Sequence, residues 1–353
     1  MLPLSRARRP ALLIVGCGDI GLRVLGLLRG RYRVLALTPT PARVSVLRAA
    51  GATPLRGDLD DADSLGRLAA LADMVLYLAP PPSQGVADPR SQRLLQALAR
   101  SARVRRIVYA STSGVYGDAG GARIDETRSV APQTDRARRR VDAEVRMRHH
   151  GRAFARRVSV LRIPGIYALD RKGGDPRERV RRGTPLLQPA DDVYTNHIHA
   201  DDLARACVAA LTRGAPQRIY HVSDDSESKM GEHFDAVADA FALPRAPRLS
   251  RNEAERALSP MQMSFLSESR RLDNRRLRQE LRLRLRYPTP AAAWAAASAS
   301  AGPPQAGEPC RPHGRETRPL LGPSKPTQVG LEPRASAPLG GRGRRRPGGQ
   351  SDP

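Results

Sequence analysis

The feature that most constrains this chain is a glycine-rich turn between an apolar strand and a helix near its start. Five apolar residues at 11–15 run directly into GCGDIG at 16–21, and apolar residues then recur through 20–28 with helical spacing. A strand, a tight turn and a helix in this order form the first half of a βαβ unit. Because further strand and helix patterns follow, the motif predicts dinucleotide binding rather than an ordinary turn.

Each glycine of this turn has a predicted mechanical role. Gly16 allows the tight bend, Gly18 lets the backbone approach a pyrophosphate, and Gly21 permits close packing of the helix on the strand. The backbone amides at the start of the helix, at Asp19 and Ile20, then face the anion and are helped by the helix dipole.

Buried strands alternate with helices through roughly the first 160 residues, which predicts an α/β fold with a Rossmann-like, doubly wound parallel sheet. Ligands of such sheets bind at the carboxyl ends of the strands. The prolines at 80–82 follow one predicted strand and force the chain away from the sheet edge, which opens a crevice there. We expect an NAD(P)-binding domain with a small C-terminal annex over residues 1–296.

The composition changes at about Ala297. Proline, glycine, serine and arginine dominate residues 297–353, and the apolar periodicity ends. This tail lacks the apolar surface that would offset its ordering entropy, so we predict that it is disordered. Its segment Gly340–Arg346 resembles an RNA-binding arginine-glycine run, but one copy without aromatic residues is a weak signal.

The formal net charge of +25 raises the question of nucleic-acid binding. A nucleic-acid interface concentrates its basic residues on one face, often with aromatic residues among them. Here the arginines are scattered through nearly every predicted helix and lysines are almost absent. The pattern favours an arginine-rich proteome with GC-rich coding, and we expect no specific nucleic-acid partner.

The three cysteines, Cys17, Cys207 and Cys310, are far apart and form no CxxC pair, so neither a disulfide framework nor a zinc site is indicated. The sequence contains no run of eighteen apolar residues, the length that a membrane-spanning helix needs. The arginines at 5–9 resemble a twin-arginine signal, but the apolar residues after them already serve as the first strand. We expect a cytoplasmic protein, and the oligomeric state stays open, with a homodimer as one alternative.

The end of the second predicted strand bears on the choice of cofactor. An NAD-selective site places an acidic residue here to accept hydrogen bonds from the ribose 2′-hydroxyl. This chain has none: Thr38 and Thr40 supply hydroxyls and Arg43 supplies a cation, which suits a 2′-phosphate. We therefore expect NADP to be preferred over NAD; the alternative is that Arg43 lies on the solvated face of the next helix.

Six motifs together resemble the NAD-dependent epimerases and dehydratases, the extended and atypical branch of the short-chain dehydrogenase/reductase superfamily. The resemblance covers roughly residues 11–290. The motifs are GCGDIG at 16–21, GDL at 57–59, YASTSGVYGD at 109–118, LRIPGIY at 161–167, NHIHADDLA at 196–204 and YHVSDD at 220–225. The resemblance implies a small polar substrate, such as a nucleotide sugar, covered mainly by residues 165–195 and 225–290.

The resemblance also assigns cofactor contacts to matching positions. Asp58 and Leu59 would touch the adenine. Ala79 and Pro80 would line the channel for the ribose and pyrophosphate, and Pro164 would flank the nicotinamide.

On the substrate side, Thr112 lies four residues before Tyr116, where the family places its catalytic serine or threonine. Asn196 lies where extended members often place a substrate-binding residue. His197 and His199 are two residues apart, but no third ligand is evident, so we expect no metal site.

The chain departs from the family at the YxxxK pair on the following helix, where Arg136 stands at the tyrosine position and Arg140 at the lysine position. A guanidinium has a pKa above about 12, so Arg136 cannot be an ordinary general acid or base. Positions 136, 140 and 144 share one helix face. Arg140 could still bind the nicotinamide ribose, with Glu144 one turn on, while Arg136 offers a planar fork suited to a carboxylate or phosphate. The alternative is a solvated arginine run.

If redox chemistry persists, its proton must come from another group, for which Tyr116, Asp88 and the hydroxyl of Thr112 are candidates. The main hypothesis is an NAD(P)-dependent epimerase, dehydratase or reductase that uses Thr112, Arg136, Arg140 and Tyr116. The second is a catalytically silent NADP-binding sensor or partner-binding module. A third, polyanion binding, depends on charge alone.

Overall fold

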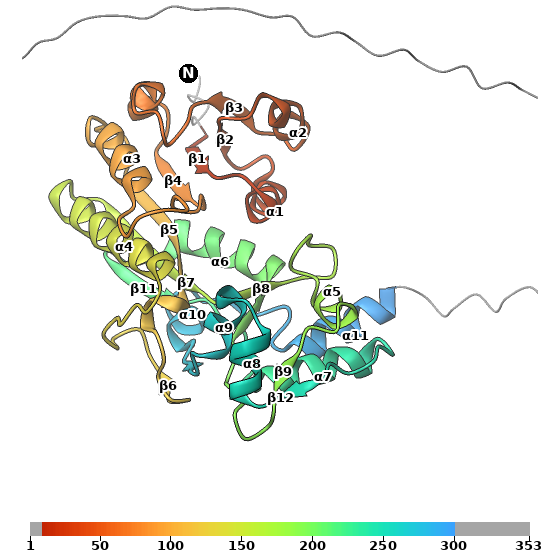
Figure 1. The fold of residues 1–353 in the computed structure, drawn as a ribbon. Coiled ribbons are helices and arrows are strands. Elements are labelled where there is room, and N and C mark those ends of the chain that lie inside the picture. Colours follow the sequence, from red (N-terminus) through yellow and green to blue (C-terminus); the bar gives the residue numbers. More distant parts are fainter. Residues whose placement is uncertain (1–8, 301–353) are drawn as a thin grey trace, which may run out of the picture. The chain divides into compact units, whose positions relative to one another are not determined.

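The computed structural model describes residues 9–300, with side chains to residue 297. Seven parallel strands of this part form one sheet, in the order β11-β7-β5-β4-β1-β2-β3 (Figure 1). The strands are β1 (Ala11–Val15), β2 (Arg33–Thr38), β3 (Thr53–Arg56), β4 (Met74–Tyr77), β5 (Arg106–Thr112), β7 (Arg157–Ile163) and β11 (Arg218–His221). The predicted doubly wound parallel sheet is confirmed.

Helices cover both faces of the sheet because the strands are apolar on both sides. Residues Leu12 and Ile14 of β1 belong to one core, and Leu13 and Val15 belong to the other, as the two-residue period of a strand requires. The first core contains α1 (Asp19–Leu28), α2 (Val44–Ala49) and α6 (Ala200–Arg213). The second contains the 3₁₀ segment η2 (Asp63–Ala70), α3 (Pro89–Ala99) and α4 (Asp135–Ala153).

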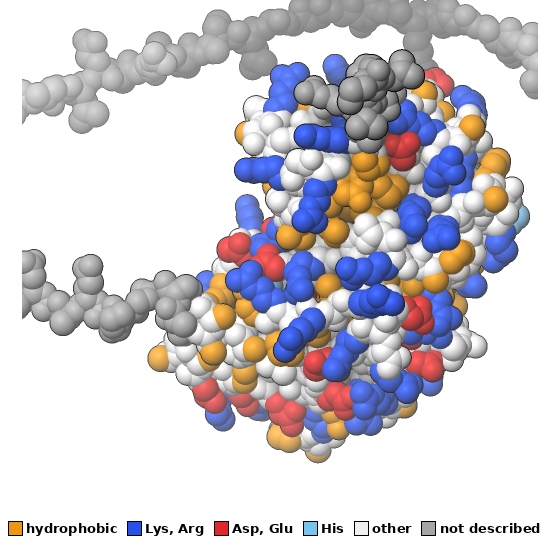
Figure 2. All heavy atoms as spheres, turned by 180° about the vertical axis from the view of Figure 1, so that it is seen from behind, with side chains coloured by type: hydrophobic (Ala, Val, Ile, Leu, Met, Phe, Trp, Pro, Cys, Tyr) orange, Lys and Arg blue, Asp and Glu red, His pale blue; other side chains and the backbone are white. Residues whose placement is uncertain are grey.

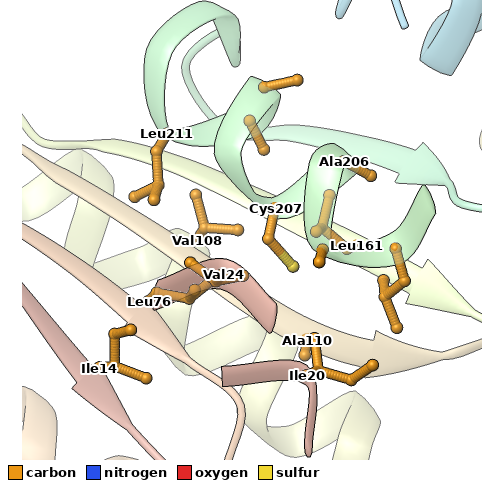
Figure 3. Close-up of a cluster of buried hydrophobic side chains, with 14 of the residues drawn as sticks. Ile14, Ile20, Val24, Leu76, Val108, Ala110, Leu161, Ala206, Cys207 and Leu211 are labelled. Atoms are coloured by element: carbon orange, nitrogen blue, oxygen red, sulfur yellow. The ribbon is translucent and has the colours of Figure 1, made fainter. Parts of the chain in front are cut away.

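Helix α6 is the centre of the first core. Figure 3 shows Cys207 of α6 directed toward Val108 and Leu161 of the sheet, with Val24 of α1 beside them. Cys207 is fully buried, and burial raises the pKa of its thiol to about 12. It therefore packs as a small apolar side chain, as does the buried and unpaired Cys17; Cys310 lies outside the described residues.

Shorter elements from the second half of the chain gather beyond one end of the sheet (Figure 1). Their helices are α5 (Pro176–Arg181), α7 (Met230–Ala240), α8 (Arg251–Ala257), α9 (Pro260–Leu266), α10 (Arg275–Gln279) and α11 (Pro290–Ser300). Three two-stranded parallel pairs join them: β8 (Gly165–Tyr167) with β10 (His197–His199), β9 (Leu186–Leu187) with β12 (Arg248–Leu249), and β6 (Arg123–Ile124) with β13 (Arg271–Leu272). Helices α5, α9 and α11 were not predicted from the sequence; α5 lies in the segment 170–190, whose polar composition indicated loops.

Two predictions, for the N-terminal arginines and for the C-terminal tail, concern residues that lie wholly or partly outside the described range. Helix α11 continues to Ser300, and the rest of the predicted tail, 301–353, lies outside them. The arginines at 5–8 also lie outside. No helix in residues 9–300 combines the length and apolarity that crossing a membrane requires.

Candidate active site

Two cavities lie at the carboxyl ends of the parallel strands, where ligands of doubly wound sheets bind. The glycine-turn cavity, about 560 Å³, is lined by Gly16–Gly21, by Leu37–Thr40 at the end of β2 and by Arg43. The arginine cavity, about 470 Å³, is lined by Pro80–Ser83 and by four arginines together with residues of the C-terminal elements. Four residues line both cavities: Pro80, Thr112, Arg140 and Pro164. The two cavities therefore adjoin.

The three glycines of the turn meet different surroundings. Gly16 has a φ of +84°, and a Cβ there would lie 2.4 Å from the backbone nitrogen of Ala79. A Cβ on Gly21 would lie 2.9 Å from Sγ of Cys17, so this glycine brings α1 against the strand. At Gly18, by contrast, a Cβ would meet nothing within 4 Å. The space beside Gly18 is thus open to a ligand.

The start of α1 fits an anion. Gly18 is its N-cap and offers no side chain to the free amides of the first turn. Those amides, which include Asp19 and Ile20, belong to residues that line the glycine-turn cavity. Open space next to uncapped amides suits the pyrophosphate of a dinucleotide.

Arg43 lies over this turn: its Nη2 donates a hydrogen bond to the carbonyl oxygen of Cys17 at 2.7 Å. Thr38 at the end of β2 is buried, and its hydroxyl accepts a hydrogen bond from the amide of Thr40. Among the described residues that line this cavity, Asp19 is the single acidic one. The end of β2 therefore presents a cation and hydroxyls to a ligand.

The carboxylate of Asp19 is already engaged. It pairs with Arg23, four residues later, and with Arg171 from the second half of the chain, whose Nε lies 3.1 Å from Oδ2 of Asp19. Arg171 also lines the glycine-turn cavity. The sequence reasoning missed Arg171, because nothing local in the sequence places residue 171 beside residue 19.

Of the positions assigned from the resemblance, Pro80 and Pro164 line the glycine-turn cavity. Asp58, Leu59 and Ala79 are not among its lining residues. The carboxylate of Asp58 instead accepts a hydrogen bond from the amide of Asp60, and Leu59 and Ala79 are buried in the second core. Ala79 thus lies against Gly16 of the turn, and none of the three residues lines the cavity.

Thr112 and Arg140 lie where the two cavities meet. Oγ1 of Thr112 accepts a hydrogen bond from the amide of Gly114 at 3.3 Å, so its O–H remains free to donate. Nη1 of Arg140 donates to the carbonyl oxygen of Ala110 at 2.7 Å and to the hydroxyl of Tyr109 at 3.2 Å. Both side chains come from the positions that the sequence predicted.

The arginine cavity contains Arg136, Arg139, Arg140 and Arg270. The guanidinium carbon of Arg136 lies 5.0 Å from the ring centre of Phe265, which belongs to α9. Arg270 pairs with Glu268 at 2.7 Å and donates to the carbonyl oxygen of Gly117 at 2.8 Å. Sequence reasoning found Arg136 and Arg140 but missed Arg139 and Arg270.

Tyr116 does not lie in either cavity. It is fully buried, and its hydroxyl lies 2.5 Å from Nε2 of His221, whose Nδ1 lies 2.9 Å from the carbonyl oxygen of Asp273. A carbonyl oxygen can only accept, so Nδ1 carries the ring proton and Nε2 accepts from Tyr116. Burial raises the pKa of Tyr116 to about 12 and lowers that of His221 to about 3. The expected catalytic contact of Tyr116 is therefore replaced by a buried hydrogen bond.

Asp88 is also outside both cavities. It is the N-cap of α3, and its carboxylate accepts hydrogen bonds from the amides of Arg90 and Ser91. Burial raises the pKa of this carboxyl. Of the three proton sources considered from the sequence, Thr112 alone reaches a cavity.

A buried ion pair joins helix α4 to the central sheet. The carboxylate of Glu144 in α4 forms an ion pair with Arg162, whose Nη2 lies 2.7 Å away, and accepts a hydrogen bond from the hydroxyl of Ser111. The guanidinium of Arg162 also lies 4.6 Å from the ring centre of Tyr116. This arrangement connects α4 to β5 and β7 beneath Thr112, and it does not pair Glu144 with Arg140.

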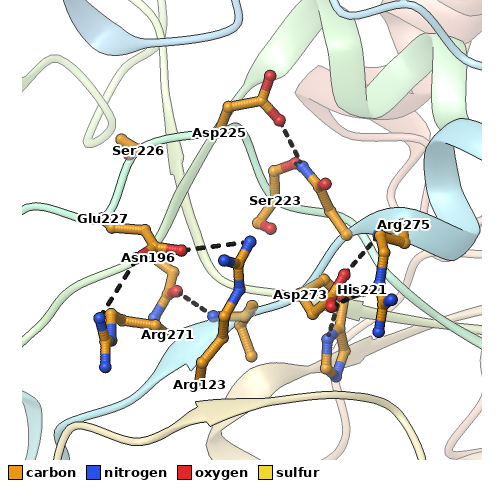
Figure 4. A network of polar contacts seen from close by, with 12 residues as sticks. Arg123, Asn196, His221, Ser223, Asp225, Ser226, Glu227, Arg271, Asp273 and Arg275 are labelled. Carbon is orange, nitrogen blue, oxygen red and sulfur yellow. Dashed lines mark hydrogen bonds and ion pairs between the residues drawn. The ribbon is translucent and has the colours of Figure 1, made fainter.

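Asn196 lines the arginine cavity, but its amide group is used by the protein. Its Nδ2 donates to the carbonyl oxygen of Arg270, and its Oδ1 accepts from the amide of Leu272, both at 2.9 Å. Figure 4 shows Asn196 in the network around β13, with Asp273 and His221 close by. Its part in the site is to hold the cavity wall that carries Arg270.

The histidines of this region stack instead of converging on an ion. The rings of His197 and His233 lie 3.9 Å apart and nearly parallel, and the ring of His199 lies 4.0 Å from that of Tyr287. Within residues 9–300 no group of three or more His, Cys, Asp or Glu side chains could hold a metal ion.

Lysine and arginine side chains are spread over the whole face shown in Figure 2, with acidic side chains among them. They do not gather into one continuous basic patch on this face.

Comparisons with known proteins agree with this geometry. The family model of the NAD-dependent epimerase/dehydratase family matches residues 12–223. A functionally unknown conserved protein from Silicibacter pomeroyi is 29% identical, with a TM-score of 0.70 over 83% of this chain and 100% of that chain. No curated protein matches the sequence.

Two enzymes of lower identity share the fold. The dTDP-glucose 4,6-dehydratase from Streptomyces venezuelae, solved with NAD bound, is 21% identical, with a TM-score of 0.64 over 82% of this chain and 98% of that one. The UDP-N-acetylglucosamine 4-epimerase from Bacillus cereus is 16% identical, with a TM-score of 0.63 over 83% of this chain and 99% of that one.

Proposed function

The chain belongs to the NAD-dependent epimerase/dehydratase family, and from this premise we propose that it binds NADP(H) in the glycine-turn cavity and acts on a small polar substrate in the arginine cavity. The observation that carries the proposal is the junction of the two cavities at Thr112 and Arg140. A cofactor in one cavity and a substrate in the other would meet there.

The preference for NADP is supported by the residues at the end of β2. A 2′-phosphate in this place would meet the guanidinium of Arg43, which has N–H donors beyond the one it gives to Cys17. Asp19 is paired with two arginines and lies at the start of α1 rather than at the end of β2. No carboxylate of the described lining is therefore placed to select a 2′-hydroxyl.

The residues at the junction would bind and polarise the reacting oxygen. A bound nicotinamide supplies or accepts a hydride. The free O–H of Thr112 donates to the substrate oxygen, and Arg140, which gives only Nη1 to protein oxygens among the described residues, stabilises negative charge on it. The proposed reaction class is reduction, epimerisation or dehydration.

The annex completes the proposed substrate site. Tyr194 and Thr195 of the segment 165–195, and Met230, Phe265 and Arg270 of the segment 225–290, line the arginine cavity. Both segments that were expected to cover the substrate therefore reach it.

A catalytically silent NADP-binding module is the second candidate, and one observation favours it. The hydroxyl of Tyr116 is committed to His221, and by the resemblance Arg136 stands where the family has its proton-exchanging tyrosine. The site then keeps binding groups without the family's usual acid.

Cofactor titration followed by turnover separates these candidates. We expect a fluorescence titration to show tighter binding of NADPH than of NADH. Arg43→Ala should lower the affinity for NADPH relative to NADH by about tenfold or more, the value of one charge-assisted contact. The matched control is Arg48→Ala, because Arg48 is an exposed arginine of α2, the helix that begins directly after Arg43, and lies outside the cavity. Oxidation of NADPH with a panel of carbonyl compounds and sugars, abolished by Thr112→Ala, supports the enzyme. Binding without turnover on any substrate supports the silent module, and binding of neither coenzyme refutes both.

A further inference from the structure

We propose that the arginine cavity recognises its ligand through an oxyanion, a carboxylate or a phosphate group, which Arg136 binds together with Arg139 and Arg140. The inference deepens the proposed function, in which this cavity holds the substrate. It names the chemical class of the substrate: an acid or a phosphate ester whose charged group lies near the reacting centre.

The charge of the cavity lining is the first observation. Four arginines and one acidic residue, Glu268, line it among the described residues, so the lining carries four positive charges and one negative charge, a net of +3. Glu268 is paired with Arg270. The three α4 arginines that line the cavity are Arg136, Arg139 and Arg140, and the lining contains no unpaired carboxylate that could neutralise their charge.

Helix α4 contains seven arginines, and three of them line the cavity. Those three, Arg136, Arg139 and Arg140, form no ion pair with any described residue. Of the arginines outside the cavity, Arg138 and Arg146 pair with Asp135 at 2.7 Å and Asp142 at 2.8 Å. Arg148 and Arg152 form no ion pair within the described residues either, so what distinguishes the cavity is that all of its α4 arginines lack a carboxylate partner.

The contacts of the three unpaired arginines leave donors free. Arg136 has a cation–π contact with Phe265, which orients a guanidinium but does not compensate its charge. Arg139 is buried, donates Nη1 to the carbonyl oxygen of Gly85, and has an Nε without any partner. Arg140 donates to two neutral oxygens, those of Tyr109 and Ala110. Each guanidinium thus keeps N–H groups for a ligand.

An oxyanion satisfies this arrangement better than a neutral ligand. Three like charges on adjacent turns repel one another, and a concave site strengthens that repulsion relative to open water. A carboxylate or phosphate compensates the charge and accepts from the planar fork of a guanidinium with matching geometry. If Arg136 stands at the tyrosine position, as the resemblance implies, this anion binds where other members carry the proton-exchanging tyrosine.

Isothermal titration calorimetry with small anions tests the proposal. The probes are inorganic phosphate and malonate, titrated into the full chain with and without NADPH, at constant ionic strength set with NaCl. We expect at least one probe to bind with a dissociation constant on the order of 1 mM. Arg136→Gln should weaken it by about tenfold or more, since it removes a charge-assisted contact. Arg138→Gln, which removes the same charge from an arginine of α4 outside the cavity, should leave the dissociation constant within about twofold.

The two arms and the control decide the outcome. Tighter binding of phosphate points to a phosphate ester, and tighter binding of malonate points to a carboxylic acid. The proposal is overturned if neither probe binds, or if Arg136→Gln and Arg138→Gln weaken binding equally, which would mean a general effect of net charge. NADPH binding is read in the same titrations, so a chain that binds NADPH but no anion refutes this inference alone. A chain that binds the anion but no NADPH refutes the proposed function alone.

Discussion

Alanine substitutions at Gly16 and Gly18 should separate folding from cofactor binding, although the two glycines are two residues apart. At Gly16 the new methyl group would lie 2.4 Å from the backbone nitrogen and 2.5 Å from the Cα of Ala79, and the residue has a φ of +84°. At Gly18 the methyl group would project into open space, and the φ of −83° lies outside the left-handed region. The first change therefore strains the protein, and the second obstructs only a ligand.

The magnitudes follow from these contacts. Alanine at positive φ costs about 1–2 kcal/mol, and forcing a methyl group into a packed contact costs about 1–3 kcal/mol more. Gly16→Ala should thus lose about 2–5 kcal/mol and lower the melting temperature by about 5–15 °C for a domain of this size. Gly18→Ala should change stability by less than about 0.5 kcal/mol, as a surface substitution does. Gly18→Ala should lower the affinity for NADPH by about tenfold to a hundredfold, because a displaced phosphate loses a charge-assisted hydrogen bond.

Differential scanning fluorimetry gives the stability of both variants, and an NADPH fluorescence titration at a temperature where both are folded gives their affinity. Gly26→Ala is the matched control, since a Cβ there also meets nothing within 4 Å and the residue lies in α1, away from the cavity. The reasoning fails if Gly18→Ala binds NADPH as tightly as the unsubstituted chain. It also fails if Gly16→Ala melts at the unsubstituted temperature.

Three further substitutions or conditions test the supports of the site. Asn196→Ala should lose about 1–3 kcal/mol, because the amide of Leu272 is left without its acceptor, and urea unfolding that is unchanged would contradict this. Glu144→Gln should lose about 3–5 kcal/mol by breaking the buried ion pair beneath Thr112, measured in the same way. Burial lowers the pKa of His150 and of His197 to about 4, that of His221 to about 3 and that of His233 well below 6.5. Below the ordinary value of 6.5 the folded state therefore binds fewer protons than the unfolded state, and stability falls with falling pH. Asp224, whose pKa burial raises to about 7, opposes one of these four histidines, so we expect the free energy of unfolding to fall by more than about 1.4 kcal/mol per pH unit from about pH 6 to 5; a flat unfolding midpoint there would refute it.

The sheet and the glycine turn could be predicted because their signals are local. Five apolar residues before GCGDIG form β1 as expected, and the alternation of later strands and helices determines the parallel order. The family resemblance is confirmed by the family model over residues 12–223. Boundaries moved by a few residues: the apolar pattern predicts a strand over residues 106–110, and in the structure this strand, β5, continues to Thr112. That difference places Thr112 at the carboxyl edge of the sheet, where the cavities meet.

Side-chain contacts between distant residues could not be predicted from the sequence. Tyr116 carries the expected motif, but its partner His221 is 105 residues away, and the resulting hydrogen bond removes its hydroxyl from the site. Asn196 occupies the expected position, yet its amide holds the segment that carries Arg270, 74 residues later. In both cases the motif predicts the place of the backbone, whereas the role of the side chain depends on what packs against it.

The same reasoning explains why the arginine cavity became evident only in the structure. From the sequence, Arg136 and Arg140 are members of a basic run that could equally be solvated, because no residue near them in sequence decides which side of α4 is covered. The decision comes from α9 and the segment after it, which bring Phe265 against Arg136 and place Arg270, already neutralised by Glu268, across the cavity. Because Glu268 already pairs with Arg270, this side of the cavity offers no free carboxylate to the arginines of α4. Arg140 lies within electrostatic range of the buried carboxyl of Asp88, whereas Arg136 has no unpaired carboxylate of the lining beside it. Replacing Arg136 should therefore change the choice of ligand before it changes the fold.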